Sequence, residues 1–126
     1  MKGNAGFACV WAYEVKADAT AAFEAAYGPG GDWVKLFSRS PCYQGTTLLR
    51  ELYRNHRYTT VDYWTSEAER NAFQKEYRNA YDALDARCEA LTIRESHVGD
   101  FQVVGSGPFH PPAQKPSNGG LVKARE

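Results

Sequence analysis

The chain has 126 residues, and its 15 lysines and arginines balance 15 aspartates and glutamates, so the formal net charge is zero. This size favours a single domain, and the neutral charge argues against a nucleic-acid partner or an anionic membrane surface. We expect a cytoplasmic protein without membrane contact, because no apolar run could span a bilayer and the N-terminus does not resemble a signal peptide. Three cysteines without CxxC spacing predict neither a disulfide framework nor a zinc site.

The first half of the chain predicts a strand followed by two helices. Residues 7–15 alternate with period two, and both faces of the strand are largely apolar. Asp18 or Thr20 is expected to cap a helix that the glycine-rich segment 28–31 ends. Asp32 is expected to cap a second, short helix.

Residues 43–53 and 57–64 then predict two antiparallel strands joined by a tight turn at Asn55-His56, where Asn tolerates a positive φ. Ser66 and Glu69 form a capping box for a helix with a long apolar stripe, and this helix is expected to bend near Asn79.

Residues 96–104 predict the last strand, on which period-two alternation places four residues on one face: His97, Gly99, Phe101 and Val103. The remaining residues, 105–126, are rich in proline and glycine and predict a tail outside the domain formed by residues 1–104.

This order of elements predicts an α+β fold of the ferredoxin-like split βαββαβ type, with a four-stranded antiparallel sheet and helices on one face. The other sheet face is also apolar, and no further element remains to cover it. Pairing this face with a second copy would bury it with two-fold symmetry, so we expect a homodimer.

Several segments resemble antibiotic biosynthesis monooxygenase (ABM) domains. The first segment is Trp33 with Leu36-Phe37, followed by residues 41–46. The second is the strand–helix junction at residues 63–68 together with Phe73, and the third is residues 97–101. The resemblance covers about residues 7–104, and its most specific part is the Trp-x-Ser-Glu junction. It implies a dimeric α/β barrel, in a family where some members oxidise aromatic phenols or anthrones with O2 and need no flavin or metal. Others in the superfamily degrade haem.

The chain departs from both branches of this resemblance. The anthrone oxidases carry an Asn four residues before the junction Trp and a Tyr six residues after it, and those positions hold Thr60 and Arg70 here. Only Trp64 matches. The haem-degrading branch carries its iron ligand, a His, where this chain has Gln74.

We consider three residues as catalytic candidates. Trp64 can orient a substrate or simply anchor the core, since a buried Trp usually needs one partner. His97 can act as a general base, or it can be a strand histidine bonded to the backbone or a carboxylate. Asp62 can accept a proton or serve as a structural partner. Six further residues are candidates for substrate binding, although core packing or ion pairing explains them about as well: Trp11, Tyr13, Arg50, Tyr58, Phe73 and Tyr77.

Arg50 in particular can hold an anionic or phenolate ligand, pair with Glu51 across the dimer, or pair with Asp62. The resulting hypothesis is a monooxygenase or oxidase without cofactor or metal, acting on an aromatic, enolisable substrate. The alternative is a non-catalytic dimer that binds a small aromatic molecule on the same scaffold.

Overall fold

Residues 6–108, the part of the chain that the computed structural model describes, form four strands, four α-helices and two short 3-10 helices. In chain order these are β1 (Phe7–Val15), η1 (Ala17–Ala19), α1 (Thr20–Tyr27), α2 (Asp32–Phe37), β2 (Tyr43–Arg50), β3 (Arg57–Trp64), α3 (Glu67–Glu76), α4 (Arg78–Cys88), η2 (Glu89–Leu91) and β4 (Thr92–Gln102). The predicted tail falls outside the described residues except for 105–108, which form no regular element.

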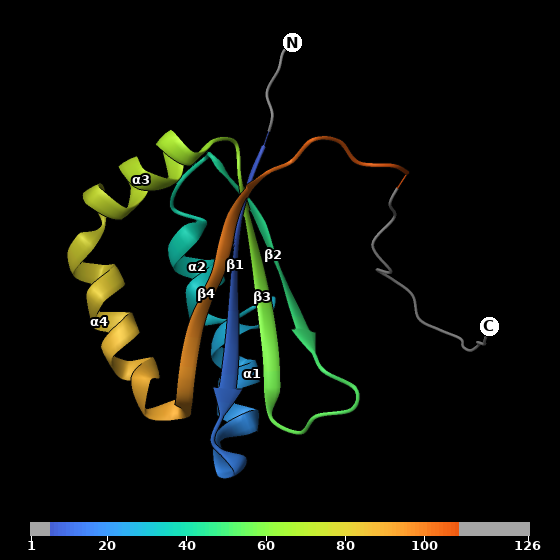
Figure 1. The fold of residues 1–126 in the computed structure, drawn as a ribbon. Coiled ribbons are helices and arrows are strands. Elements are labelled where there is room, and N and C mark those ends of the chain that lie inside the picture. Colours follow the sequence, from blue (N-terminus) through green and yellow to red (C-terminus); the bar gives the residue numbers. More distant parts are fainter. Residues whose placement is uncertain (1–5, 109–126) are drawn as a thin grey trace.

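The strands form one antiparallel sheet in the order β2-β3-β1-β4. Together with the helices that follow β1 and β3, this order is the predicted α+β, ferredoxin-like topology. The helices lie on one side of the sheet, and the opposite face of the sheet carries none (Figure 1). None of the helices described is long and apolar enough to cross a membrane.

An aromatic core fills the space between the sheet and the helices. Phe23 of α1 and Trp64 at the end of β3 are almost completely buried. The Trp64 ring packs against Phe37 of α2 and Phe73 of α3, with ring centroids 5.4 and 5.2 Å away. Large rings contribute most of the buried apolar area in a domain of this size. This core fixes the strand–helix junction on which the ABM resemblance depends.

The helix boundaries agree only partly with the sequence prediction. Ser66 caps α3 as expected, because its hydroxyl accepts a hydrogen bond of 3.1 Å from the Glu69 amide. The long helix breaks at Tyr77, close to the predicted bend. The predicted caps at Asp18, Thr20 and Asp32 are wrong: Ala19 and Gly31 occupy the cap positions, and neither helix has a side-chain cap.

The hairpin between β2 and β3 is wider than predicted. The strand ladder ends at Arg50, and residues 51–56 form a loop closed by a 2.9 Å hydrogen bond from the Glu51 amide to the Arg57 carbonyl. The residue with a positive φ is His56, at 65°, and not the asparagine before it. The side chains of Leu52 and Tyr53 are highly exposed in this loop, so no burial holds them to a strand.

The face of the sheet away from the helices carries partly exposed apolar side chains. Tyr63 of β3, Leu49 of β2 and Phe101 of β4 are 36%, 50% and 47% exposed, respectively. The register places Tyr63 and Phe101 on either side of Ala8 in the central strand. The dimer prediction depends on this exposed apolar surface, and the dimer itself stays a prediction.

Candidate functional site

Two neighbouring cavities lie between the sheet and the helices. The first, called here the acidic cavity, has a volume of about 160 Å³ and is lined by Trp11, Tyr13, Tyr27, Trp33, Phe37, Thr46, Thr60, Asp62, Tyr81, Asp85 and Glu95. The second, called the arginine cavity, has a volume of about 230 Å³ and is lined by Cys9, Trp11, Phe37, Asp62, Trp64, Arg70, Gln74, Tyr81, His97 and Asp100. Four residues line both: Trp11, Phe37, Asp62 and Tyr81.

Asp62 is the carboxylate shared by the two cavities. It lies between Thr60 and Trp64 in the alternation of β3, on the side of the sheet that faces the helices. Directly opposite on β2, Thr46 donates a hydrogen bond of 2.6 Å from its hydroxyl to Asp62 Oδ1. Burial raises the pKa of Asp62 to about 6, although the hydrogen bond from Thr46 and the charge of Arg70 act in the opposite direction. Asp62 can therefore act as a base near neutral pH.

A chain of hydroxyl groups continues from Asp62 away from the cavities. The Thr46 hydroxyl also contacts the hydroxyl of Tyr43, at the start of β2. Since Thr46 uses its proton toward Asp62, Tyr43 is the donor in the second bond. Burial raises the pKa of Tyr43, so it stays a neutral donor. Thr46 and Tyr43 thus fix the orientation of the Asp62 carboxylate.

Arg70 and His97 surround a second carboxylate at the far side of the arginine cavity. His97 Nε2 lies 2.9 Å from Asp100 Oδ1, and Arg70 Nη2 lies 3.7 Å from Asp100 Oδ2. Burial raises the pKa of Asp100, but the hydrogen bonds from His97 and Cys9 and the charge of Arg70 hold it below its usual value. Asp100 is therefore ionised. The arginine cavity also carries a basic group, Arg70, which lies on the side of Asp62 away from Thr46.

The placement of His97 differs from the sequence prediction. Period-two alternation predicted His97 on the same face as Gly99 and Phe101, but a bulge shifts the register between β1 and β4 at Val10/Trp11. As a result Gly99 pairs with Val10 on the outer face, whereas His97 pairs with Trp11 on the cavity side. The rings of His97 and Trp11 lie 5.0 Å apart. The bulge thus turns His97 toward the arginine cavity.

The structure brings together five of the nine predicted site residues: Trp11, Tyr13, Asp62, Trp64 and His97 line one or both cavities. The other four line neither. Phe73 lies in the core beside Trp64, and Tyr77 packs under the Arg39 guanidinium.

Arg50 and Tyr58 lie at the opposite end of the sheet from the arginine cavity. Both donate hydrogen bonds to Glu24 Oε2 of α1, at 2.8 and 2.5 Å. Within the chain Arg50 pairs with Glu24, so the predicted pairing with Asp62 is wrong. Glu51 pairs with Arg54 in the same chain, and the predicted pairing of Arg50 with Glu51 across a dimer stays a prediction. Helix α1 supplies a partner that the local sequence around Arg50 did not reveal.

Sequence reasoning missed several residues that line the cavities. Thr46 lies in a segment of the ABM resemblance, but no function was predicted for it from the sequence. Asp85 lies on α4 and Glu95 on β4, two elements that only the fold brings together. Arg70 and Gln74 were identified as departures from the family pattern, and both line the arginine cavity. The positions marked by the ABM resemblance therefore help to locate the cavity, even where this chain carries other residue types than the family.

Three potential metal ligands cluster in the arginine cavity. The ligand atoms of Cys9, His97 and Asp100 lie within 4.8 Å of one another. However, Arg70 Nη1 lies 3.5 Å from Cys9 Sγ, and the same guanidinium contacts Asp100. Burial raises the pKa of the Cys9 thiol to about 11, which opposes the thiolate that a metal requires. The guanidinium already supplies the positive charge at this cluster.

The residues do not fit haem. An amide, Gln74, lines the arginine cavity where the resemblance places the iron-ligating imidazole, and haem proteins use His, Cys, Met or Tyr in that role. The cavity volume of about 230 Å³ is also below the roughly 300–1,000 Å³ typical of sites for drug-sized ligands.

Comparison with solved structures shows which proteins share this fold. SnoaB, a cofactor-independent oxygenase from Streptomyces nogalater, in a single-substitution variant, aligns with a TM-score of 0.69 and 22% identity over 82% of this chain and 98% of its own. A Bordetella bronchiseptica protein proposed to be an antibiotic biosynthesis monooxygenase aligns with a TM-score of 0.66 and 20% identity over 79% of this chain and 98% of its own.

A variant of MhuD with two manganese protoporphyrin IX molecules bound per active site aligns with a TM-score of 0.64 and 24% identity over 82% of this chain and 99% of its own. No family model matches the sequence, and no curated protein matches it. These structures confirm the ABM resemblance at the level of the fold: the chain has the ferredoxin-like α+β fold of the ABM-type oxygenases.

Proposed function

We propose that this protein is a monooxygenase that uses O2 without flavin or metal and acts on an aromatic, enolisable substrate such as an anthrone or naphthol. The observation that carries the proposal is the position of Asp62, a partly buried carboxylate with a pKa of about 6 that lies at the boundary of two cavities walled by aromatic rings. A base tuned near neutral pH inside a partly enclosed aromatic site is what deprotonation of a weak carbon or phenol acid requires.

The chemistry needs only a base, a pocket and stabilisation of negative charge. Asp62 accepts a proton from the substrate methylene or hydroxyl, which leaves an electron-rich enolate. This anion transfers electrons to O2, and a carbon–oxygen bond forms to give a peroxide. Loss of water from the peroxide converts the carbon that bonded O2, a methylene in an anthrone or a ring CH in a naphthol, to a carbonyl, so that one oxygen atom of O2 is retained and the other leaves as water.

The basic side of the arginine cavity is suited to the anionic stages of this reaction. Arg70 can stabilise the enolate oxygen, because a guanidinium in a partly buried site interacts strongly with developing negative charge. His97, held by Asp100, can give a proton to the peroxide when water leaves. Trp64 is 1% exposed and forms part of the wall, where we propose that it orients the substrate ring.

Oxygen uptake tests this function. Purified protein, treated with chelator and free of flavin, is mixed with a panel of anthrones and naphthols while dissolved O2 is recorded. We expect protein-dependent uptake with at least one anthrone, with one O2 consumed for each quinone formed. Uptake that requires added flavin or metal would contradict the proposal.

A second candidate, a non-catalytic small-molecule binder, is favoured by one observation. The Thr60 hydroxyl, at the position of the anthrone-oxidase Asn, lies 3.1 Å from the Tyr13 hydroxyl, and Thr60 is only 3% exposed, so this group has a protein partner already. Tight binding of an anthrone or flavonoid without oxygen uptake across the panel would support this role.

We also propose a homodimer formed through the outer face of the sheet, because Leu49, Tyr63 and Phe101 present apolar surface there. A cytoplasmic location stays a prediction from the sequence, and the free thiols of Cys9, Cys42 and Cys88 agree with a reducing compartment.

A further inference from the structure

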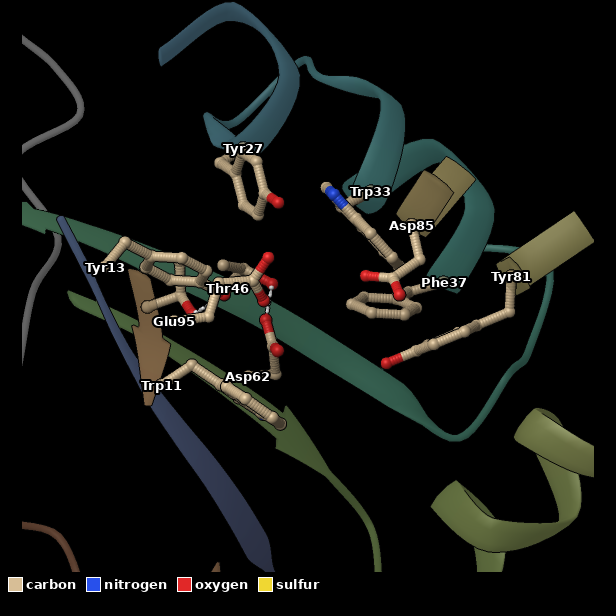
Figure 2. Close-up of a pocket in the computed structure, with 11 residues that line it drawn as sticks. Trp11, Tyr13, Tyr27, Trp33, Phe37, Thr46, Asp62, Tyr81, Asp85 and Glu95 are labelled. Atoms are coloured by element: carbon tan, nitrogen blue, oxygen red, sulfur yellow. Dashed lines mark hydrogen bonds between the residues drawn. The ribbon is translucent and has the colours of Figure 1, made fainter. Parts of the chain in front are cut away.

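The acidic cavity is lined by three carboxylates and by no basic side chain. Asp62, Asp85 and Glu95 all line it, whereas its other lining residues are aromatic rings and two threonines. None of the three carboxylates makes an ion pair with any residue of the described segment 6–108. Figure 2 shows them among the rings, with the Asp85 carboxylate directed into the enclosed space.

The surroundings of Asp85 and Glu95 are negative. Burial raises the pKa of Asp85, and the neighbouring charges of Glu89 and Asp82 raise it further. Burial likewise raises the pKa of Glu95, with additional contributions from Asp85 and Glu89. Like charges that share a half-buried site destabilise one another, and a cation placed between them relieves this repulsion.

The aromatic walls also favour a cation. Tyr13, Tyr27 and Trp33 line the acidic cavity, and the rings of Tyr27 and Trp33 lie 5.9 Å apart. Ring faces attract ammonium groups, most strongly where water is excluded, and carboxylates beside aromatic rings are a recurrent way of binding amines. An anionic ligand would meet only repulsion on this side.

The indole N–H of Trp33 is a buried donor at the wall of the acidic cavity. Trp33 is 8% exposed, and its Nε1 makes no hydrogen bond of ordinary geometry to the described residues. The nitrogen lies at the edge of the ring nearest Tyr27 (Figure 2). The Cys88 thiol, which does not line the cavity, is a weak acceptor close to this indole, and a stronger acceptor on a ligand would compete with it.

The two cavities differ in their basic groups. Arg70, in contact with Asp100, supplies a positive charge in the arginine cavity, whereas Asp85 and Glu95 line the acidic cavity without a basic partner, and Asp62 lines both. A ligand that spans both is oriented if it carries an acidic oxygen at one end and a basic group at the other.

We propose that the acidic cavity binds a protonated amine carried by the substrate, with the ammonium group held by Asp85 and Glu95 and flanked by aromatic rings. This places the enolisable oxygen toward Arg70 and the proton to be removed at Asp62. The identification of this ligand as a substrate rests on the proposed function, but the binding preference does not require turnover.

Calorimetric titration with three naphthalene probes that differ in charge tests the proposal. The probes are 2-naphthylmethylamine, 2-naphthalenemethanol and 2-naphthoate, which are cationic, neutral and anionic at neutral pH. We expect the amine to bind about tenfold more tightly than the alcohol, and the carboxylate to bind most weakly. Asp85→Asn and Glu95→Gln, which keep the shape of each side chain, should each weaken amine binding about fivefold and leave alcohol binding within about twofold.

Glu76→Gln is the matched control, because Glu76 is exposed at the end of α3 and lines neither cavity. It should leave the affinity for all three probes unchanged. Equal affinity for amine and alcohol, or equal loss of affinity for all probes in Asp85→Asn and Glu95→Gln, would overturn the proposal.

The outcome is separable from that of the proposed function. Selective amine binding without oxygen uptake would support the amine site and contradict the oxygenase activity. Uptake with anthrones by a protein that shows no amine preference would support the activity and remove the amine site.

Discussion

The hydroxyl of Thr46 on β2 donates a hydrogen bond of 2.6 Å to Asp62 on β3, and the two residues are direct partners in the sheet. This bond favours the ionised form of Asp62, whereas burial disfavours it, and burial is the larger effect. The balance between the two sets the pKa of the proposed base, and the first two predictions follow from it.

Replacing the Thr46 hydroxyl should shift the pH dependence of activity. Thr46→Val keeps the β-branched shape but removes the hydrogen bond that lowers the pKa of Asp62. We expect the pH midpoint of oxygen uptake to follow that pKa, which is about 6, and therefore to be higher in Thr46→Val than in wild type. Initial rates measured from about pH 5 to 9 would check this. Thr47→Val is the control, since Thr47 is exposed on the opposite face, and its midpoint should not move.

Asp62 should make the stability of the fold depend on pH. Its pKa rises from the ordinary aspartate value of 3.8 to about 6 in the folded protein, so the folded state binds this proton more tightly than the unfolded state. The stabilisation is fully present below about pH 4 and is lost as the pH rises through about 6. Asp62→Asn should therefore be more stable than wild type at pH 7, by up to ~3 kcal/mol, with a smaller difference at pH 4.

Urea unfolding of wild type and Asp62→Asn at the two pH values measures this difference directly. Asp18→Asn, at an exposed position after β1, serves as the control and should match wild type at both pH values. A wild-type protein that gains stability relative to Asp62→Asn on going from pH 4 to pH 7 would show that the sign is wrong.

Replacing Arg70 should lower the rate of turnover more than it weakens the binding of a substrate through its amine end. Arg70→Met retains an apolar stem over the Phe7 ring, which the guanidinium now covers at 5.0 Å, but loses the charge beside Asp100. We expect kcat to fall by about 10²-fold, because an oxyanion-stabilising group is lost, while KM changes little. Arg70→Lys should recover part of kcat; a rise in KM alone would instead indicate a binding role. Arg78→Met, on the exposed side of α4, is the control.

The outer face of the sheet should determine the oligomeric state. Phe101→Glu places a charge on the apolar outer face that also carries Tyr63 and Leu49, and it should convert a dimer to a monomer in light scattering at micromolar concentration. Leu52→Glu, in the β2–β3 loop, changes an equally apolar and more exposed residue away from the strands and should leave the dimer intact. A wild-type protein that is already a monomer would contradict the dimer proposal.

The fold could be predicted from the sequence because its strands and helices carry distinct periodicities. Residues 7–15 and 57–64 alternate as strands, and the Ser66 cap begins a helix at the predicted residue. Errors arose where tertiary contacts override local preference. His56, and not Asn55, adopts the positive φ. Its carbonyl accepts a hydrogen bond from the Val15 amide of β1, a tertiary contact that the local sequence does not reveal.

The site was less predictable, for two physical reasons. A bulge at Val10/Trp11 reverses the face of His97, and a single-residue irregularity of this kind leaves no period-two signature in the strand that carries it. The acidic cavity combines Asp85 and Glu95, whose charges are typical of ordinary surface residues until the fold places them beside the rings of β1 and α2. Asp62 could be identified because it precedes Trp64 by two residues on a predicted strand.

The most direct test of the central claim compares oxygen uptake by the metal-stripped, flavin-free wild type and Asp62→Asn, with one anthrone and Asp18→Asn as control. We predict that wild type and the control consume one O2 per quinone with rates that rise through about pH 6, while Asp62→Asn is at least about 10²-fold slower at every pH. An Asp62→Asn variant with wild-type rates would contradict the account, because the proton would then be accepted elsewhere.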